Sequence, residues 1–316
     1  MTDFEFVPAT KEQAKARVAL AGPAGSGKTM TGLILATRLA EGGRVAVIDT
    51  ERGSASKYAD RFKFDRNNMY RYDPRDLPKA LAAAAKGGYE AVLIDTLSRF
   101  WSGAGGMLEF VDGAAKRNYG GQGLGGWKEA RPIENDMIEA MLGYPGHLIV
   151  TMRVKTHYDV TKTPDGKTVP VKIGLQPEQR AGIEYEFDVV GDLDLENTLT
   201  VSKSRCPELT GHVIPRPGHE VAETLLAWLT DGTPARTPND YRDMAIDPEM
   251  SYTDLQDLYR LVKADGKLAA KVMDDGARLV TLHDLITGRG RLIADSRRAA
   301  GEAHAAAEGA QEGEAA

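Results

Sequence analysis

The sequence predicts an α/β protein in which a mainly parallel sheet is flanked by helices. Short apolar runs of strand length alternate along the chain with amphipathic segments of helix length. A glycine-rich loop, residues 22–29, stands between the first strand and the first helix. The runs at 44–49 and 91–95 are almost continuously apolar and end in an aspartate, which is typical of strands covered on both faces. Alternating strands and helices imply a parallel sheet with right-handed crossovers.

The expected elements follow from apolar periodicity and from glycine and proline breaks. Strands are predicted at residues 17–21, 44–49, 68–72, 91–95, 147–151, 185–190 and 198–202. Helices are predicted at residues 27–40, 54–62, 74–86, 127–142 and 220–230. The glycine-rich stretch 102–126 fits neither pattern. Residues 153–182 contain the turn signal Thr163-Pro164-Asp165-Gly166 between β-favouring flanks, which predicts a β-hairpin leaving the core.

The chain is predicted to divide into a large core and a small appendage. Residues 1–14 form a lead-in, 15–232 the core, 233–250 a linker rich in Pro, Asp and Thr, and 251–297 a small helical region. The tail, 298–316, consists mainly of Ala, Gly and Glu, and is expected to be disordered because it cannot bury enough apolar surface.

Composition narrows the possible classes of protein. The 316 residues include one cysteine, Cys206, so neither an internal disulfide nor a cysteine zinc site is expected. No apolar run approaches the roughly 20 residues of a membrane span, and the N-terminus does not read as a secretory signal, so we expect a cytoplasmic protein with no membrane partner. The net charge of −6 disfavours nucleic-acid binding over the whole surface but allows a local basic groove.

The loop before the first helix has the composition of a phosphate-binding P-loop. Glycines allow a tight turn whose N–H groups point at an anion, and the helix N-terminus adds its own positive dipole end. Lys28 can reach the β- and γ-phosphates, and the Thr29 hydroxyl can ligate Mg²⁺. We therefore predict binding of ATP with Mg²⁺ by a loop that consists of Gly22, Pro23, Ala24, Gly25, Ser26, Gly27, Lys28 and Thr29, followed by Met30.

Two acidic residues end predicted strands where they could serve this chemistry. Asp95 follows Ala91-Val92-Leu93-Ile94 and is expected to hold Mg²⁺ or its water. Thr96 follows it where many helicases, packaging motors and AAA+ proteins carry a glutamate, so the residue that activates water must come from elsewhere. Glu51, at the end of the other buried strand, can approach the γ-phosphate because the carboxyl ends of parallel strands converge on the ligand.

These residues resemble the RecA and recombinase branch of P-loop ATPases. The strand end Ile48-Asp49-Thr50-Glu51 matches the Ile-Asp-x-Glu of that branch, which implies that Glu51 is catalytic. The resemblance also places a phosphate sensor at Thr151 and Arg153, where RecA usually has a polar amide. The chain is most similar to phage-encoded AAA-type, RecA-like ATPases, some of which are single-strand annealing recombinases, over roughly residues 15–230. The shared motifs are GPxGSGKT, IDTE, LID, T-x-R-x-K and K-S-R.

A basic pair late in the core, Lys203 and Arg205, is expected to act between subunits. In a regular strand Leu199, Val201, Lys203 and Arg205 would share one face. RecA-like rings and filaments use such a pair from a neighbouring subunit to neutralise charge in the transition state. The resemblance therefore implies a homo-oligomer, either a ring or a filament, in which Lys203 and Arg205 are catalytic.

Two segments combine basic and aromatic side chains, as single-stranded DNA sites do. Both leave the core where RecA-like proteins have their DNA loops. The glycine-rich stretch and the start of the next helix offer Lys116, Arg117, Tyr119, Trp127 and Lys128, although Trp127 would equally fit the core of that helix. The predicted hairpin offers Lys155, His157, Tyr158, Lys162, Lys167 and Lys172.

The leading hypothesis is a DNA-stimulated, oligomeric ATPase that acts on single-stranded DNA in phage recombination or replication, in the host cytoplasm. A single-strand-binding protein or another replication protein would be a natural further partner. A helicase or a helicase loader on the same core remains an alternative. A ParA-like partition switch is disfavoured because Pro23 stands where that family has a lysine. A small-molecule kinase would need neither Glu51 nor the basic pair, and would lack ATPase activity stimulated by DNA.

Overall fold

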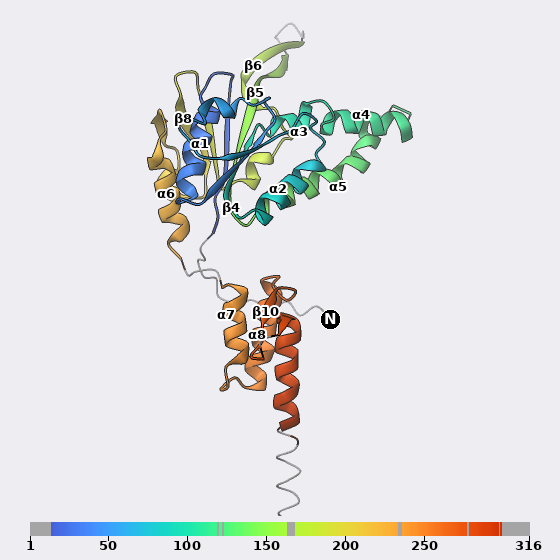
Figure 1. The fold of residues 1–316 in the computed structure, drawn as a ribbon. Coiled ribbons are helices and arrows are strands. Elements are labelled where there is room, and N and C mark those ends of the chain that lie inside the picture. The colour runs from blue at the N-terminus through green and yellow to red at the C-terminus, as the bar shows by residue number, and fades with distance from the viewer. Residues whose placement is uncertain are drawn as a thin grey trace, which may run out of the picture. The chain divides into compact units, whose positions relative to one another are not determined.

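The computed structural model describes residues 14–118, 120–121, 123–162, 168–232, 236–276, 278–296 and 298. The predicted lead-in and tail therefore lie almost wholly outside the described residues, as do the side chains of residues 156–174 in the hairpin. The chain forms two compact units, Met1–Thr233 and Pro234–Ala316. Figure 1 shows the elements of each.

The first unit is built on a mixed, mostly parallel sheet, which confirms the predicted fold class. Its strand order is β3-β2-β4-β5-β1-β7-β8-β9, with β6 paired to β5 alone. Strands β1 to β5 and β7 are parallel, whereas β8 runs antiparallel to both of its neighbours, β7 and β9, near one edge. The strands are β1 Arg17–Gly22, β2 Arg44–Asp49, β3 Asp65–Asn68, β4 Tyr89–Asp95, β5 His147–Lys162, β6 Thr168–Pro177, β7 Val189–Leu193, β8 Thr198–Ser204 and β9 Val213–Pro215.

Helices cover both faces of this sheet. They are α1 Lys28–Leu39, α2 Asp76–Lys86, α3 Ser98–Ser102, α4 Met107–Asn118, α5 Gly123–Leu142 and α6 His219–Thr230, with 3₁₀ turns at Ala55–Tyr58, Ile183–Glu186 and Pro207–Leu209. Helices α4 and α5 extend away from the sheet as a helical arm, and the β5–β6 hairpin projects beyond the carboxyl ends of the strands (Figure 1). No helix among the described residues is long and apolar enough to cross a membrane.

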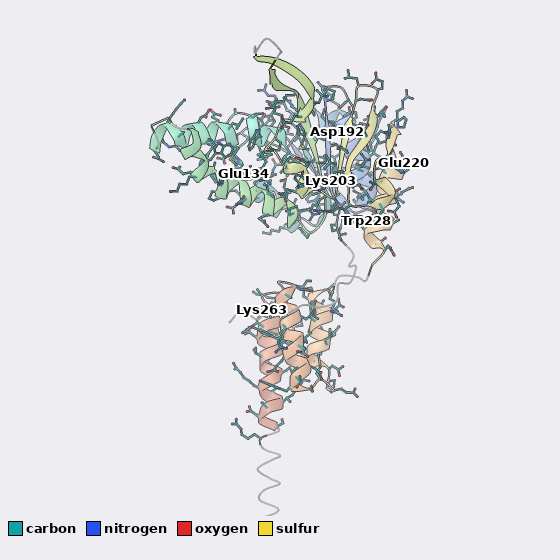
Figure 2. All side chains as sticks on the ribbon, turned by 180° about the vertical axis from the view of Figure 1, so that it is seen from behind. Glu134, Asp192, Lys203, Glu220, Trp228 and Lys263 are labelled. Atoms are coloured by element: carbon teal, nitrogen blue, oxygen red, sulfur yellow. The ribbon has the colours of Figure 1, made fainter. Side chains whose placement is uncertain are left out.

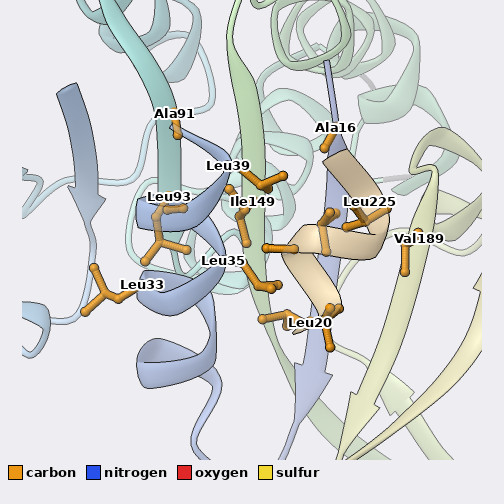
Figure 3. Packing of buried hydrophobic residues seen from close by; sticks show 14 of the residues in the cluster. Ala16, Leu20, Leu33, Leu35, Leu39, Ala91, Leu93, Ile149, Val189 and Leu225 are labelled. Carbon is orange, nitrogen blue, oxygen red and sulfur yellow. The ribbon is translucent and has the colours of Figure 1, made fainter. Parts of the chain in front are cut away.

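Two apolar cores lie on opposite faces of the sheet. One joins α1 and α6 to the sheet through fully buried residues such as Leu20, Leu33, Leu35 and Leu225 (Figure 3). The other joins α2, α3 and α5 to the opposite face. Truncating one such leucine to alanine typically costs about 2–5 kcal/mol, so the two cores fix the positions of the strand ends that carry the polar residues.

Two strands of the sheet lie a few residues away from their predicted positions. The strand expected at 68–72 is β3, Asp65–Asn68, which carries polar residues because it lies at the exposed edge beside β2. The strand expected at 185–190 begins later, as β7, after a 3₁₀ turn at Ile183–Glu186. In both cases apolar periodicity placed the strand a few residues away from its true position.

The glycine-rich stretch 102–126 is largely helical, contrary to expectation. It contains all of α4 and the start of α5, and these two helices pack against each other in the helical arm. Glycine is unfavourable in a helix by about 1 kcal/mol relative to alanine. At Gly126, however, a Cβ would overlap the carbonyl oxygen of Val111, so glycine allows the close approach of the two helices. Tertiary packing here overrides local propensity.

The second unit has its own small core. Helices α7 Pro238–Ile246 and α8 Tyr252–Ala264 pack with a two-stranded ladder, β10 Lys271–Met273 and β11 Leu279–Thr281, and with a helical segment at 282–296. The predicted linker, 233–250, therefore contains a helix, α7, and the predicted helical region contains strands. Thr237 and Ser251 form capping boxes with Asp240 and Asp254, which specify where α7 and α8 begin.

Two buried polar residues, Arg17 and His147, form hydrogen bonds with backbone groups at the amino end of the sheet. The guanidinium of Arg17 donates hydrogen bonds to the carbonyl oxygens of Ala16, Leu142, Tyr144 and Gly146. His147 is buried, and its Nδ1 accepts a hydrogen bond from the Ala16 N–H at 3.1 Å, which requires a neutral ring with its proton on Nε2. Burial, helped by the charges of Lys15 and Arg17, lowers the pKa of His147 to about 4.

Acid should therefore destabilise the first unit through His147. Below pH 6.5 His147 binds a proton in the unfolded chain, whereas in the folded chain it binds one only near pH 4. The contribution of neutral His147 to the free energy of unfolding is thus fully present above pH 6.5 and is lost as the pH falls. At pH 5 this loss amounts to about 2 kcal/mol. His147→Gln keeps an acceptor but removes the titration, so it should lose less stability than the wild type between pH 7 and pH 5.

Urea unfolding at these pH values, followed by tryptophan fluorescence, measures this difference, because Trp101, Trp127 and Trp228 all lie in the first unit. His212→Gln, at an exposed histidine, is the matched control. Equal pH dependence in the wild type and His147→Gln would contradict this role.

Candidate active site

The P-loop follows β1 and leads into α1, as predicted. Gly25 and Gly27 have φ values of +83° and +87°, which favour glycine, and Gly27 is the N-cap of α1. A Cβ at Gly27 would also overlap the side-chain amide of Asn197. The Lys28 ammonium donates to the Pro23 carbonyl at 2.7 Å and lies 3.5 Å from the Ser26 hydroxyl. Burial lowers the pKa of Lys28, while Glu51 and Asp95 oppose this shift.

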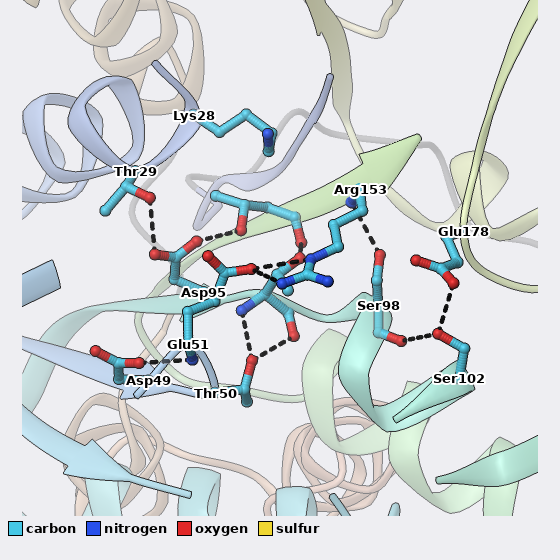
Figure 4. Close-up of polar contacts among 12 residues, drawn as sticks. Lys28, Thr29, Asp49, Thr50, Glu51, Asp95, Ser98, Ser102, Arg153 and Glu178 are labelled. Carbon is cyan, nitrogen blue, oxygen red and sulfur yellow. Dashed lines mark hydrogen bonds and ion pairs between the residues drawn. The ribbon is translucent and has the colours of Figure 1, made fainter. Parts of the chain in front are cut away.

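Asp95 is the buried centre of the site. Its Oδ2 accepts a hydrogen bond from the Thr29 hydroxyl at 2.8 Å, and its Oδ1 accepts one from the Thr151 hydroxyl at 2.6 Å (Figure 4). Burial raises the pKa of Asp95, and the two hydroxyl donors oppose this shift. Because β5 lies between β1 and β4, Thr151 sits between the P-loop and the aspartate. The structure thus brings together three residues predicted from three separate segments.

Glu51 and Arg153 form the second polar pair of the site. Arg153 donates from Nε and Nη2 to Glu51 Oε1, at 3.0 and 2.6 Å, and both side chains are partly exposed (Figure 4). The Glu51 N–H donates to Asp49 Oδ1, and the Arg153 N–H donates to the Ser98 hydroxyl. The base and the sensor predicted from the sequence are therefore in direct contact.

One cleft of about 600 Å³ joins these residues. It is lined by parts of the P-loop, by Glu51, Asp95 and Arg153, and by Tyr58, Val154 and Glu178. Sequence reasoning missed Glu178, which is brought in at the base of the hairpin and accepts a hydrogen bond from the Ser102 hydroxyl at 2.8 Å. It also missed Asn197, whose amide donates to the Ser26 carbonyl at 3.0 Å. No local motif marks either residue.

The residues at the P-loop fit a magnesium ion. Mg²⁺ prefers hard oxygen ligands and usually binds proteins through one or two side chains together with phosphate oxygens and water. The Thr29 hydroxyl and the Asp95 carboxylate lie within 2.8 Å of each other, at the edge of the cleft. Within the described residues no cluster of three or more His, Cys, Asp or Glu side chains forms an independent metal site.

Lys203 and Arg205 lie away from the P-loop of their own chain. Strand β8 runs antiparallel, so Thr198 is near the P-loop end and Ser204 pairs with Val189 at the other end. Figure 2 shows Lys203 well below Asp192, toward that other end of the sheet. Lys203 donates to the carbonyl oxygens of Glu184, Tyr185 and Phe187, and Arg205 pairs with Asp188 at 2.9 Å.

The prediction that the basic pair shares a face with Leu199 and Val201 is wrong. Val190 pairs with Lys203, but Gly191 pairs with Val201, so Ser202 is an extra residue in β8. Such a β-bulge interrupts the alternation of side chains. Leu199 and Val201 pack into the α1–α6 core, whereas Lys203 reaches the 3₁₀ turn at Ile183–Glu186, whose Ile183 belongs to the opposite core.

The candidate DNA residues are only partly described. Lys116, Arg117 and Lys128 are exposed on the helical arm, Trp127 is half-buried in α5, and Lys155 is exposed at the start of the hairpin. Tyr119, Lys167 and the side chains of His157, Tyr158, Lys162 and Lys172 lie outside the described residues. The backbone of β5 pairs with that of β6 from Val154 opposite Pro177 to Lys162 opposite Thr168.

Comparison of the sequence with known proteins and protein families identifies the family of this chain. A search of curated proteins found no match. The AAA domain family matches residues 14–221, which include the P-loop, Glu51, Asp95, Thr151, Arg153 and the basic pair. This match spans more than half of the chain and covers nearly all of the sheet, and it agrees with the geometry of a nucleotide-binding P-loop ATPase. The chain therefore belongs to the AAA domain family.

Proposed function

We propose that this AAA-type P-loop protein is an oligomeric ATPase that acts on single-stranded DNA in recombination or replication. The observation that carries the proposal is the continuity of β5. Within this strand Thr151 contacts Asp95, Arg153 contacts Glu51, and the hairpin begins at Val154. An element that projects into solvent is thus joined without interruption to the polar residues of the nucleotide cleft.

Each polar residue has a role that follows from its position. Lys28 and the P-loop N–H groups bind the β- and γ-phosphates. Mg²⁺ held by Thr29 and Asp95 would neutralise phosphate charge. Glu51 orients a water molecule and accepts its proton, and Arg153, 2.6 Å away, fixes the direction of the carboxylate. Thr151 holds the other oxygen of Asp95 in place.

The hairpin offers a route from DNA to this chemistry. Arg153 directly precedes the paired part of the hairpin, and its carbonyl accepts a hydrogen bond from the Glu178 N–H at 2.7 Å. A shift of the hairpin on binding DNA would move Arg153 relative to Glu51 and so change the rate of hydrolysis. The basic residues of the hairpin and of the helical arm supply the charge that a DNA backbone requires.

The recombination and phage setting rests on the sequence motifs. The combination of GPxGSGKT, IDTE, LID, T-x-R-x-K and K-S-R resembles phage-encoded RecA-like ATPases, including annealing recombinases. ATP with Mg²⁺ and single-stranded DNA would then be the ligands, the homo-oligomer the working form, and the host cytoplasm the place of action.

Glu51→Gln should leave ATP affinity nearly unchanged but lower kcat by about 10²–10⁴, because the amide keeps the shape of the side chain yet cannot accept the proton. Steady-state hydrolysis and binding of a fluorescent ATP analogue measure the two effects. Glu178→Gln changes the other partly exposed carboxylate of the cleft. A large loss of kcat in Glu178→Gln but not in Glu51→Gln would assign the base to Glu178 instead.

Replacing residues 160–169 by the two-residue turn Asn-Gly should weaken binding of single-stranded DNA and flatten its dependence on salt, because fewer phosphate contacts release fewer counterions. Fluorescence anisotropy of a labelled oligonucleotide over a range of salt concentrations measures this. DNA-independent ATPase activity should persist and serves as the control for folding. If affinity and salt dependence stay as in the wild type, the hairpin is not a DNA-binding element.

Arg205→Ala should lower kcat at least about tenfold if the side chain completes a neighbouring active site. Mixing subunits of two variants distinguishes a role between subunits from damage within one subunit. Glu51→Gln subunits keep the basic pair, and Arg205→Ala subunits keep an intact nucleotide cleft. Mixed assemblies should regain part of the activity. Asp188→Asn, which removes the ion-pair partner of Arg205, controls for loss of that local contact. Absence of recovery in mixtures that light scattering shows to co-assemble would contradict a role between subunits.

A further inference from the structure

A second cavity, of about 460 Å³, lies apart from the nucleotide cleft and shares none of its lining residues. It is formed by α3, by α5 and by the chain just after β6. Its volume falls within the range of about 300–1,000 Å³ that is usual for small-molecule sites. The lining residues are Trp101, Trp127, Arg131, Glu134, Asn135 and Arg180.

Two indole rings form the apolar part of this cavity. The ring centroids of Trp101 and Trp127 are 5.7 Å apart, with their planes tilted by 33°. Both side chains are half-buried, because each also packs against the small core of the helical arm around Met107, Val111 and Ala130. Their remaining surface is open to the cavity, so they offer aromatic faces held in a fixed orientation.

The polar part is formed by the buried carboxylate of Glu134 and the partly exposed guanidinium of Arg180. Glu134 is only 7% exposed, and its Oε1 lies 3.9 Å from Arg180 Nε, which is too far for a hydrogen bond. Within the described part of the chain, the buried Nε of Arg180 has no hydrogen-bond partner. Arg180 is held by its other nitrogen, Nη2, which donates to Glu186 at 2.7 Å.

A buried donor without a partner is costly, so a ligand that accepts a hydrogen bond from Arg180 Nε and also contacts Glu134 would gain affinity from both groups. That ligand must carry a donor for Glu134 next to an acceptor for Arg180. Burial raises the pKa of Glu134, and Arg180 and Arg131 oppose this shift. With two arginines and one glutamate around it, the cavity disfavours a cationic ligand.

We propose that this cavity binds an unpaired nucleobase of single-stranded DNA. A base stacks on aromatic rings, and its Watson–Crick edge places a donor beside an acceptor. Arg131, exposed one turn after Trp127 on α5, lies where it can contact the phosphate that follows the base. A base within a duplex cannot enter, because both its edge and its faces are occupied.

The position of the cavity agrees with this ligand. Arg180 lies three residues after the end of β6, so the cavity borders the base of the hairpin. Glu134 lies in the middle of the helical arm, and Trp228 lies far from it on α6 (Figure 2). The inference rests on the proposed action on single-stranded DNA and names the part of the protein that contacts a base.

Tryptophan fluorescence of the full chain carrying Trp228→Phe tests the proposal, because Trp101 and Trp127 are then the only tryptophans left. The probes are a thymidine homopolymer and an abasic oligonucleotide of the same length, each brought to saturation as judged by anisotropy of an end label. We expect the thymidine homopolymer to quench the fluorescence and the abasic strand to leave it unchanged. If Trp228→Phe does not fold, the wild type gives the same comparison with a constant contribution from Trp228.

The outcomes separate the two proposals. Saturable binding of both oligonucleotides with equal or absent quenching would overturn the base site and leave DNA binding intact. No binding of either oligonucleotide by the wild type would overturn the proposed action on DNA, and the base site with it.

Two variants complete the test. Glu134→Gln and Trp127→Leu should each weaken binding of the thymidine homopolymer about tenfold and affect the abasic strand little, since stacking and edge contacts involve the base alone. Glu139→Gln, an exposed glutamate on the same helix, is the matched control. If both strands weaken equally in Glu134→Gln, then Glu134 acts through the fold or the overall charge, and the assignment fails.

Discussion

The buried carboxylate of Asp95 is the constraint on which the active site depends. It is almost fully removed from water, and it directly follows four buried apolar residues of β4. An ion in such a place is costly unless it is paired or hydrogen-bonded. The hydroxyl groups of Thr29 and Thr151 meet this need, and in doing so they bind the P-loop helix, β4 and β5 to one point. The same arrangement presents oxygen atoms to the nucleotide cleft.

Around Asp95, neighbouring strand ends are joined by further hydrogen bonds. The Thr50 hydroxyl accepts from the Thr96 N–H at 2.8 Å, and the Thr96 hydroxyl donates to the Thr151 carbonyl at 2.6 Å. These contacts connect β2, β4 and β5 in sequence, so Glu51 at the end of β2 is held relative to Thr151. The Glu51–Arg153 pair is the more exposed part of this network, and therefore the part that an approaching ligand or a moving hairpin can alter most easily.

Much of this site could be predicted from the sequence, because its residues gather at the carboxyl edge of the parallel sheet. Lys28, Thr29, Glu51, Asp95, Thr151 and Arg153 follow apolar runs, and a parallel sheet brings such ends together. Glu178 and Asn197 could not be found, since they depend on how the hairpin and the β7–β8 turn fold back. The prediction of the strand face that carries Lys203 was wrong because one bulged residue in β8 reverses the alternation of side chains. Helix α4 and the start of α5 were missed because packing at Gly126 outweighs helix propensity.

The hairpin has a consequence for the entropy of recognition. Loops that become ordered only when they meet a ligand lose backbone freedom at that moment, about 1–2 kcal/mol per residue. Here β5 runs from the centre of the sheet into the hairpin as one strand, and its backbone is paired with β6 along the way. The entropic cost of ordering this backbone therefore arises when the protein folds and not when the ligand binds. A ligand that contacts the paired backbone of β5 and β6 finds it already ordered, so more of the contact energy remains for affinity or for displacing Arg153.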